Sequence, residues 1–460
     1  MTFSIKPSQH HNSFKNSKKP HILMLTNHGV HEWQITAGLP DTGGQNIFVN
    51  QFTDNLVKKG YKVTIANRGG YPHPVQGNIN QGLHYKNDSQ RLLYLEDEKK
   101  LFVSKEDMSD HIQPLANFLV DFFSQEEDQI DMIISHYWDA GCIAAAFLQH
   151  WNTPIKHIWV PHSLGIIKKQ NVLQEQWASL RIDERIQFET ELIKQVDGIA
   201  ATSSLIKISL TKMDYSGPIL WLPPCVDVDR YFPDRIDSND PIWDFLSHCS
   251  GQTPEIIQNS TIITEISRTD TTKRKDILIK AFASVLPFYP DTFMIISINK
   301  NKSEIADDLI NLIKDIGIEN RIAIVGSIWD ILPKIYQVSD IYCTPSIMEG
   351  FGMSAQEAAA SQVPVIASHL VPFATEYLLD EKSRKTLQKT SSPFKPIVGE
   401  GAIIVEADDI DGFADSLQIL LEDDARRDQM GKNAFQSTIP QFTWDHIVRD
   451  FLTETGLITK

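Results

Sequence analysis

Short apolar runs alternate with helix-length segments along most of the chain, and this alternation is the feature that most constrains the fold. An apolar run, a helix and a second run make a βαβ unit, whose strands lie parallel in one sheet with the helix on a face. The runs of the first half are residues 21–26, 62–66, 132–134, 157–160 and 198–201. Those of the second half are residues 262–266, 293–296, 322–325, 341–343 and 364–367. The sequence therefore predicts an α/β fold built from two parallel sheets.

The two halves meet at Pro223 and Pro224, which suit a stiff linker because proline fixes its own backbone angle. With 460 residues the chain also exceeds the usual domain size of about 100–200 residues. We expect a flexible basic tail at residues 1–20, a first domain at 21–223, a second at 224–441, and a helix at 442–460 that packs back on the first domain. The polar residues 382–398 are expected to form a long loop.

Glu349 and Glu357 flank a turn that contains Gly350 and Gly352, just after the apolar run 341–343. A strand that ends in such a turn and continues into a helix points backbone N–H groups and the positive helix end at a ligand, which suits a diphosphate. An ordinary strand–helix connection has the same pattern, so this segment alone leaves both interpretations open.

Four further polar clusters follow predicted strands, at the sheet edge where α/β proteins bind ligands. They are residues 43–45, 135–141 and 162–169, and the pair Arg268 and Lys273. Adjacent glycines such as Gly43 and Gly44 let the backbone approach a phosphate, and a paired arginine and lysine can neutralise a diphosphate. The alternatives are a solvated basic turn after Arg268 and a structural role for His136.

Composition excludes several classes of function. A net charge of -16 and an isoelectric point near 5.4 argue against nucleic acid as a partner, because binding its phosphates needs a basic face. No apolar run approaches the ~18 residues that a membrane helix needs. The four cysteines are scattered and no His-Glu-x-x-His motif occurs, so we expect no metal site. We expect a cytoplasmic protein with no membrane partner.

Taken together, the motifs resemble the retaining nucleotide-sugar glycosyltransferases of the sucrose-phosphate synthase group, and residues 135–141 and 163–169 resemble those of mannosylfructose-phosphate synthases in particular. The resemblance also rests on Asp-Thr-Gly-Gly-Gln at residues 41–45, Glu-Arg-Ile-Gln at 184–187, and the glutamate turn. It implies a GT-B fold, in which two Rossmann-like domains face a central cleft, with the donor on the second domain and the acceptor on the first.

The resemblance also implies roles on the donor side. Arg268 and Lys273 would bind the diphosphate and stabilise the leaving nucleotide, Glu349 would bind sugar hydroxyls, and Glu357 the ribose. The amides at the start of the helix would hold the sugar and phosphate. The implied donor-binding residues are Gly44, Arg268, Lys273, Glu349, Phe351, Gly352, Met353 and Glu357.

On the acceptor side, His162 would contact the transferring sugar, and Lys168 with Arg185 would hold a phosphate. The implied acceptor-binding residues are Gly43, Gly44, Gln45, Tyr137, Asp139, His162, Ser163, Lys168 and Arg185. The implied catalytic residues are Arg268, Lys273, Glu349 and His162.

These roles imply a metal-independent hexosyltransferase that makes sucrose 6-phosphate from UDP-glucose and fructose 6-phosphate. No cofactor would be required, with Mg²⁺ at most a stimulator. A separate phosphatase would act on the product, because the chain is too short to add a phosphatase domain.

GDP-mannose as the donor, giving mannosylfructose phosphate, is an alternative. A lipid or polymer acceptor and a non-catalytic sensor of sugar nucleotides are two others.

The chain departs from the family pattern in three places. Cys225 stands where many relatives have a glycine after two prolines, and Arg274 stands where a glycine usually follows the phosphate lysine. Residues 369–376 replace a glycine-containing loop.

Overall fold

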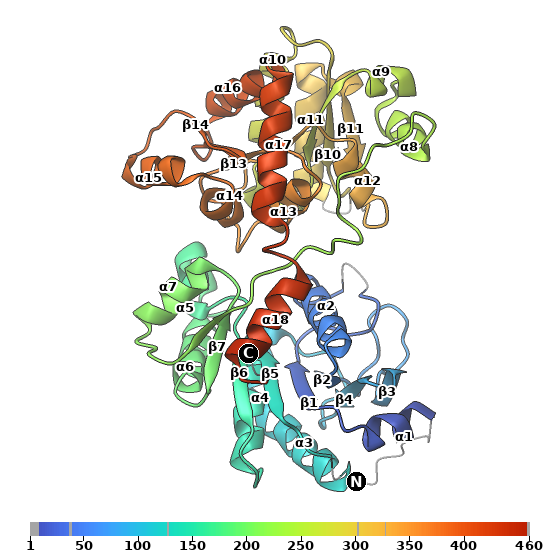
Figure 1. Ribbon diagram of the computed structural model, residues 1–460, viewed down its shortest axis with the longest axis vertical. Helices are drawn as coiled ribbons and strands as arrows, with labels where there is room; N and C mark the ends of the chain where they lie inside the picture. The colour runs from blue at the N-terminus through green and yellow to red at the C-terminus, as the bar shows by residue number, and fades with distance from the viewer. Residues whose placement is uncertain (1–8, 36–38, 127, 301–302, 327, 458–460) are drawn as a thin grey trace. The chain divides into compact units, whose positions relative to one another are not determined.

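The computed structural model describes residues 9–35, 39–126, 128–300, 303–326 and 328–457 (Figure 1). The chain divides into two compact units. Unit 1 comprises Met1–Pro223 and Ile447–Lys460, and unit 2 comprises Pro224–His446.

Unit 1 is built on an eight-stranded sheet with the order β3-β4-β2-β1-β5-β6-β7-β8. All neighbouring strands are parallel except the edge strand β3, which is antiparallel to β4. The strands are β1 (His21–Thr26), β2 (Lys62–Arg68), β3 (Gly82–Asn87), β4 (Gln90–Leu95), β5 (Met132–His136), β6 (Lys156–Val160), β7 (Gly198–Ala201) and β8 (Ile219–Trp221). The helices are α1 (Gln9–Asn16), α2 (Gly44–Lys58), α3 (Ile112–Glu126), α4 (Tyr137–Gln149), α5 (Gly165–Asn171), α6 (Ile182–Leu192) and α7 (Ser204–Lys212).

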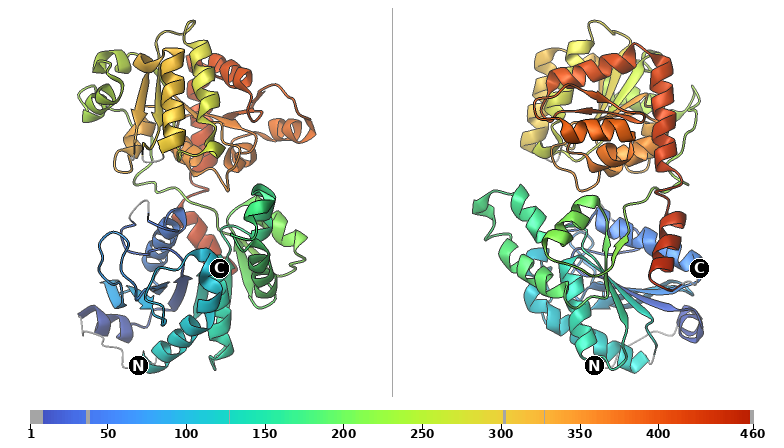
Figure 2. Two further views of the ribbon diagram at one scale, coloured as in Figure 1. Left: turned by 180° about the vertical axis from the view of Figure 1, so that it is seen from behind. Right: turned by 60° about the vertical axis from the view of Figure 1, so that its left-hand side comes forward.

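The side chains of alternate residues of β1 point to opposite faces of this sheet, as strand geometry requires. Leu23 and Leu25 pack in one cluster with residues of α3 and α4. Met24 points the other way, where its sulfur accepts a hydrogen bond from Thr53 of α2. Helix α18 (Trp444–Glu454) also packs in this unit (Figure 2). The ring of Phe451 meets that of Phe52 edge to face.

Unit 2 is built on a seven-stranded sheet with the order β11-β10-β9-β12-β13-β15-β14, parallel except for the short edge strand β14. The strands are β9 (Thr261–Glu265), β10 (Thr292–Ser297), β11 (Ile322–Val325), β12 (Ile341–Thr344), β13 (Val365–Ser368), β14 (Ile397–Val398) and β15 (Ala402–Val405). The helices are α8 (Pro241–Ser250), α9 (Pro254–Gln258), α10 (Lys275–Val285), α11 (Ser303–Ile316), α12 (Leu332–Gln337), α13 (Met353–Ala360), α14 (Pro372–Tyr377), α15 (Glu381–Lys389), α16 (Ile410–Leu421) and α17 (Asp424–Thr438).

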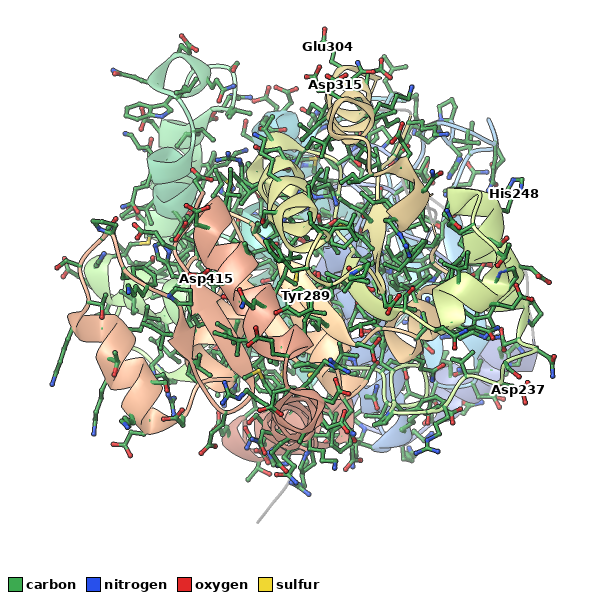
Figure 3. All side chains as sticks on the ribbon, turned by 90° about the horizontal axis from the view of Figure 1, so that it is seen from above. Asp237, His248, Tyr289, Glu304, Asp315 and Asp415 are labelled. Carbon is green, nitrogen blue, oxygen red and sulfur yellow. The ribbon has the colours of Figure 1, made fainter. Side chains whose placement is uncertain are left out.

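The buried core of unit 2 lies on both faces of its sheet. Phe293 and Ile295 of β10 pack in a cluster with residues of α8, α12 and α13, whereas Met294 and Ile296 pack with residues of α10, α11 and α16. Acidic side chains such as Glu304 and Asp315 of α11 project from the outside of this layer (Figure 3). Two Rossmann-like domains, which the sequence predicts, are confirmed.

The expectation that residues 1–20 form a flexible tail is wrong for the part that the structure describes. Residues 9–16 form α1, and residues 1–8 lie outside the described residues. Phe14 is fully buried, and the guanidinium of Arg91 lies 4.2 Å from the centre of its ring. Arg91 is itself buried and paired with Glu126 at 2.5 Å. The aromatic ring covers this buried ion pair, so the segment is held in place.

The expectation of a long loop at residues 382–398 is also wrong. Most of the segment forms α15 and the edge strand β14. Asp380 caps α15 by accepting a hydrogen bond from the amide of Ser383 at 3.0 Å. The capping contact, the buried Ser383 and the partly buried Leu387, which packs against the core cluster of unit 2, hold this helix in place.

Candidate active site

The glutamate turn of unit 2 connects β12 to α13 through a backbone shape that only glycine adopts readily. Gly352 has φ 106°, and a Cβ at this position would lie 2.7 Å from Cγ1 of Val371. Phe351 is buried, and its carbonyl accepts a hydrogen bond from the amide of Phe373 at 2.7 Å. The turn is therefore fixed, and the first N–H groups of α13, from Met353 onward, are left for a ligand.

Lys273 and Glu349, which the sequence predicts separately, meet in the structure. Nζ of Lys273 lies 2.5 Å from Oε1 of Glu349 and 3.4 Å from both Oγ of Ser346 and the carbonyl of Met348. Both side chains are largely buried. Arg268, in contrast, is 83% exposed and lies 3.5 Å from Asp270. The site thus combines one fixed cation with one that is free to reach an anion.

The loop that carries Arg268 and Lys273 lies on a buried ion pair that sequence reasoning does not predict. Lys275 pairs with Glu265 at the end of β9, and both side chains are only 1% exposed. Nζ of Lys275 also donates to Oγ of Ser267 at 2.9 Å. Arg274 adopts the left-handed backbone at φ 47°, a conformation that favours glycine and so explains why one is usual there.

Glu357 lies on α13, where it accepts a hydrogen bond from the hydroxyl of Tyr336 at 3.0 Å. Burial raises the pKa of Glu357 from its ordinary value of 4.5 to about 7. The carboxyl group therefore changes between neutral and charged forms near neutral pH.

This shift predicts a specific pH dependence of stability. Because the folded protein holds the Glu357 proton more tightly than the unfolded chain does, ionising this group costs stability as the pH rises from 4.5 to about 7. We expect the melting temperature of the wild type to fall relative to that of Glu357→Gln across this window, as measured by thermal melts at pH 4 to 8. The exposed substitution Glu304→Gln is the control. A constant difference between wild type and Glu357→Gln would contradict the assignment.

In unit 1, Gly43 and Gly44 open α2 directly above the end of β1. The amide of Gly43 donates to Oδ1 of Asn46 at 2.9 Å, which caps the helix. A Cβ added at either glycine would meet nothing within 4 Å, so packing does not demand glycine here and open space lies over the helix start. Gln45 donates from Nε2 to Oγ1 of Thr26 at 3.2 Å.

His162 follows β6 and lies next to His136, at the end of the neighbouring strand β5. Nε2 of His162 and Nδ1 of His136 share a hydrogen bond of 2.8 Å, and the two rings stack with centroids 5.1 Å apart. The edge of Phe48 packs against the ring of His162, with centroids 5.0 Å apart. Burial lowers the pKa of His162 to about 3, so its ring is neutral at physiological pH.

Arg185 of α6 organises the other predicted acceptor residues. Its Nε donates to Oε1 of Glu189 at 2.7 Å, and its Nη2 donates to the carbonyl and Oγ of Ser163 at 2.7 and 2.9 Å. Its Nη1 donates to the hydroxyl of Tyr137. Since Glu189 is fully buried and Arg185 only 5% exposed, most of the charge of Arg185 is already balanced within the protein.

Tyr137 and Asp139 are held by contacts inside unit 1. The backbone of Tyr137 lies in the left-handed region at φ 75°, which is rare for a bulky residue and often marks a functional site. Its carbonyl accepts a hydrogen bond from Nε1 of Trp159 at 2.9 Å. Asp139 is fully buried and accepts a hydrogen bond from Nδ1 of His28 at 3.1 Å.

A small cavity at this end of unit 1 gathers positive charge. Its charged lining residues are Lys105, Lys168, Arg181, Arg185, Glu106 and Glu184. Nζ of Lys168 lies 3.3 Å from Oε1 of Glu106, and burial lowers the pKa of Lys168. The cations outnumber the acids on this wall although the chain as a whole is acidic. Asp41 and Glu189, which lie outside this lining, pair with Lys105 and Arg185, so an anion such as a phosphate would compete with carboxylates for these cations.

Lys105 and Arg181 were missed by the sequence interpretation. Lys105 stands beside Glu106, and Arg181 stands two residues before Asp183, so the sequence alone suggests solvated charges at both positions. In the structure Lys105 pairs with Asp41 of the Asp-Thr-Gly-Gly-Gln motif, and Arg181 pairs with Glu184 at 2.5 Å. The one available signal was the motif itself, whose aspartate needs a cationic partner.

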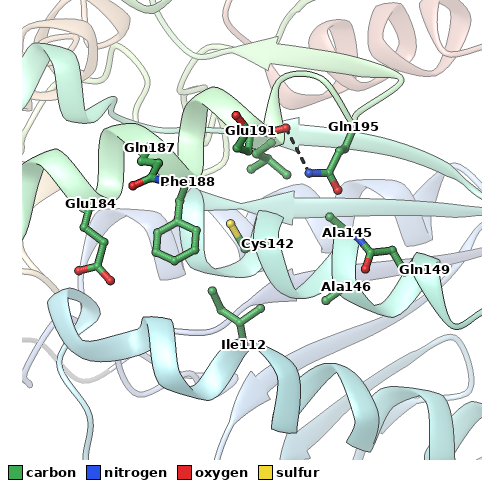
Figure 4. Close-up of a pocket in the computed structure, with 11 residues that line it drawn as sticks. Ile112, Cys142, Ala145, Ala146, Gln149, Glu184, Gln187, Phe188, Glu191 and Gln195 are labelled. Carbon is green, nitrogen blue, oxygen red and sulfur yellow. Dashed lines mark hydrogen bonds between the residues drawn. The ribbon is translucent and has the colours of Figure 1, made fainter.

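A different cavity of about 420 Å³ lies among α3, α4 and α6 and contains none of the predicted site residues (Figure 4). Side chains such as Ile112, Cys142 and Phe188 line it. It opens on helices rather than at the carboxyl ends of strands, so we do not assign it to the active site.

Among the described residues, no helix is long and apolar enough to cross a membrane. Within the same part of the chain, no three histidine, cysteine, aspartate or glutamate side chains are grouped so that they could hold a metal ion.

Two family models match successive parts of the chain. Glycosyltransferase Family 4 matches residues 42–230, and Glycosyl transferases group 1 matches residues 252–437. The chain is 25% identical over 375 residues to a mannosylfructose-phosphate synthase of Agrobacterium fabrum, which covers 77% of each chain. It is 24% identical over 413 residues to a D-inositol 3-phosphate glycosyltransferase of Corynebacterium diphtheriae, which covers 88% of each.

Solved structures give the same picture of the fold. A sucrose-phosphate synthase from Thermosynechococcus elongatus superposes with a TM-score of 0.73 at 20% identity, covering 95% of this chain and 99% of that one. Alr3699/HepE of Anabaena in complex with UDP-glucose superposes with a TM-score of 0.62 at 14% identity, covering 95% and 100%.

Proposed function

Because this chain is a glycosyltransferase of the group 1 family with the GT-B fold, we propose that it transfers a hexose from a nucleotide sugar to a sugar phosphate. The proposed donor is UDP-glucose, the proposed acceptor is fructose 6-phosphate, and the product is sucrose 6-phosphate. The observation that carries the proposal is the cavity of unit 1 where Lys105, Lys168 and Arg181 converge, since such a set of cations suits a phosphate.

Unit 2 supplies the groups for the donor. Lys273 and Arg268 bind the diphosphate, with the N–H groups at the start of α13 adding positive potential. As the bond from the anomeric carbon to the phosphate oxygen breaks, negative charge grows on the diphosphate, and these fixed cations stabilise it. Glu349, held by Lys273, accepts hydrogen bonds from the sugar hydroxyls. Glu357 binds the ribose.

Unit 1 supplies the groups for the acceptor. Lys168 binds the acceptor phosphate together with Lys105 and Arg181, while Arg185 holds Ser163 and Tyr137 in place. The acceptor hydroxyl attacks the anomeric carbon on the face that the diphosphate leaves, and its proton passes to the leaving phosphate oxygen. The new bond therefore keeps the configuration of the old one, and a separate phosphatase removes the phosphate from the product.

A second candidate uses GDP-mannose and gives mannosylfructose phosphate. The likeness to the synthase of Agrobacterium fabrum favours it. Both reactions use the same acceptor, so they differ only in the groups that read the nucleotide base and the sugar.

A kinetic experiment tests the acceptor phosphate. Lys168→Ala should raise the KM for fructose 6-phosphate roughly 10- to 100-fold, because a charge-assisted hydrogen bond worth ~1.5–3 kcal/mol is lost. The KM for free fructose should stay unchanged. Lys169→Ala is the matched control, since this neighbour pairs with Asp183 and is absent from the cavity lining. If wild type used fructose and fructose 6-phosphate equally well, the proposed acceptor would be wrong.

A further inference from the structure

The hydrogen bond between His136 and His162 constrains where the ring protons lie. Burial lowers the pKa of both histidines, so both rings are neutral and each carries one proton. In a neutral pair, one nitrogen of the bond must donate and the other must accept. Two arrangements satisfy the 2.8 Å contact between Nδ1 of His136 and Nε2 of His162.

The other nitrogen of His136 decides between them. Its Nε2 is buried and has no hydrogen-bond partner among the described residues. A proton there would be a buried donor without an acceptor, and orphaned buried N–H groups are rarer in proteins than under-satisfied acceptors. Placing the proton of His136 on Nδ1 removes that donor and makes the shared hydrogen bond at the same time. Nε2 of His162 is then the acceptor, and its own proton must lie on Nδ1.

The surroundings of Nδ1 of His162 differ from those of the ring nitrogens of His136. The side chain of His162 is only partly buried, whereas His136 is fully buried. Within the part of the chain that the structure describes, the polar contact of the His162 ring is the one with His136. An N–H group at Nδ1 is therefore available to a ligand at the end of β6, where the left-handed backbone of His162, at φ 54°, positions the ring.

We propose that His136 is a positioning residue that holds His162 in the Nδ1–H form, so that His162 donates a hydrogen bond to a hydroxyl oxygen of the transferring hexose. The opposite tautomer would present a bare nitrogen, which could only accept. The sugar contact rests on the proposed function, whereas the tautomer does not.

The first test reads the tautomer without substrate. Protein labelled with ¹⁵N-histidine is studied by long-range ¹H–¹⁵N NMR, and the ring of His162 is assigned as the signal set lost in His162→Gln. We expect the wild type to carry the proton on Nδ1, with Nε2 unprotonated. A proton on Nε2 of His162 would overturn the proposal, whatever the enzyme transfers. This experiment does not depend on whether a variant of His136 folds.

Variants of His136 then test whether this residue sets the tautomer of His162. His136→Phe keeps the ring but removes the hydrogen bond, so His162 should lose its single tautomer and kcat should fall roughly 10- to 100-fold, as for other orienting partners. The KM for the sugar phosphate should change little. His136→Asn places an amide near the former Nδ1 and should restore the tautomer and most of the rate. A restored tautomer with kcat as low as in His136→Phe would refute the positioning role.

His157 provides the matched control. It is also fully buried, lies on β6, and pairs with Oγ of Ser135 at 2.7 Å rather than with His162. His157→Phe should disturb packing to a similar degree yet leave the His162 tautomer as in the wild type. If His157→Phe and His136→Phe change the His162 signals equally, packing and not the hydrogen bond sets the tautomer.

Discussion

Lys273→Ala will lower kcat/KM for the nucleotide sugar by ~10²–10³, the size expected when one contact to a charge that develops in the transition state is lost. The loss should fall largely on kcat, because the diphosphate carries more charge in the transition state than in the bound donor. Lys273 is the fixed cation of the donor site, held against Glu349 at 2.5 Å. Steady-state kinetics with varied donor concentration measures the effect.

Two further variants sharpen this experiment. Lys280→Ala removes an exposed lysine from α10 in the same unit and should leave both constants within about twofold. Arg268→Ala should show a loss like that of Lys273→Ala if the exposed arginine closes on the diphosphate. A loss below about threefold for both Arg268→Ala and Lys273→Ala would reject the donor site as assigned.

Arg185→Ala will lower the free energy of unfolding by ~3–5 kcal/mol, because it leaves the fully buried carboxylate of Glu189 without its cation. Arg181→Ala, which removes a partly exposed arginine from the wall of the same cavity, should cost about 1 kcal/mol or less. Chemical denaturation followed by tryptophan fluorescence compares the two variants. The contrast separates an arginine held in a fully buried ion pair from one whose ion pair is partly exposed.

A double substitution provides the internal check. Arg185→Met combined with Glu189→Leu removes both buried charges and should recover much of the lost stability. If Arg185→Ala proved as stable as the wild type but raised the KM for the sugar phosphate, Arg185 would be a ligand for the acceptor, as the sequence resemblance implies.

The strands that carry the fold could be predicted because their residues are apolar on both faces of a parallel sheet. Strand β4 was missed because it begins with Gln90 and Arg91. Arg91 is tolerated there only because Glu126 and Phe14, from distant parts of the chain, pair with it and cover it. Such a contact has no local pattern in the sequence, so neither β4 nor α1 can be predicted from the residues around them.

The candidate site likewise has a part that the sequence predicts and a part that it does not. Motifs identified Lys273, Glu349 and His162, because chemistry demands particular residue types at strand ends. Their partnerships depend on how strands are ordered in the sheets, so the contact of His162 with His136 required the structure. Arg185 shows what a motif cannot predict. The pattern assigns its guanidinium to a phosphate, but in the structure this guanidinium donates hydrogen bonds to Glu189 and Ser163.

A mass-spectrometric screen of nucleotide sugars against sugars and sugar phosphates tests the central claim most directly. The wild type, incubated with UDP-glucose or GDP-mannose and fructose 6-phosphate, should yield a phosphorylated disaccharide and free nucleoside diphosphate in equal amounts. Fructose in place of fructose 6-phosphate should yield little. Which donor reacts would decide between the two candidate reactions. A disaccharide formed equally well from free fructose, or nucleotide released with no product on any sugar phosphate, would contradict the account.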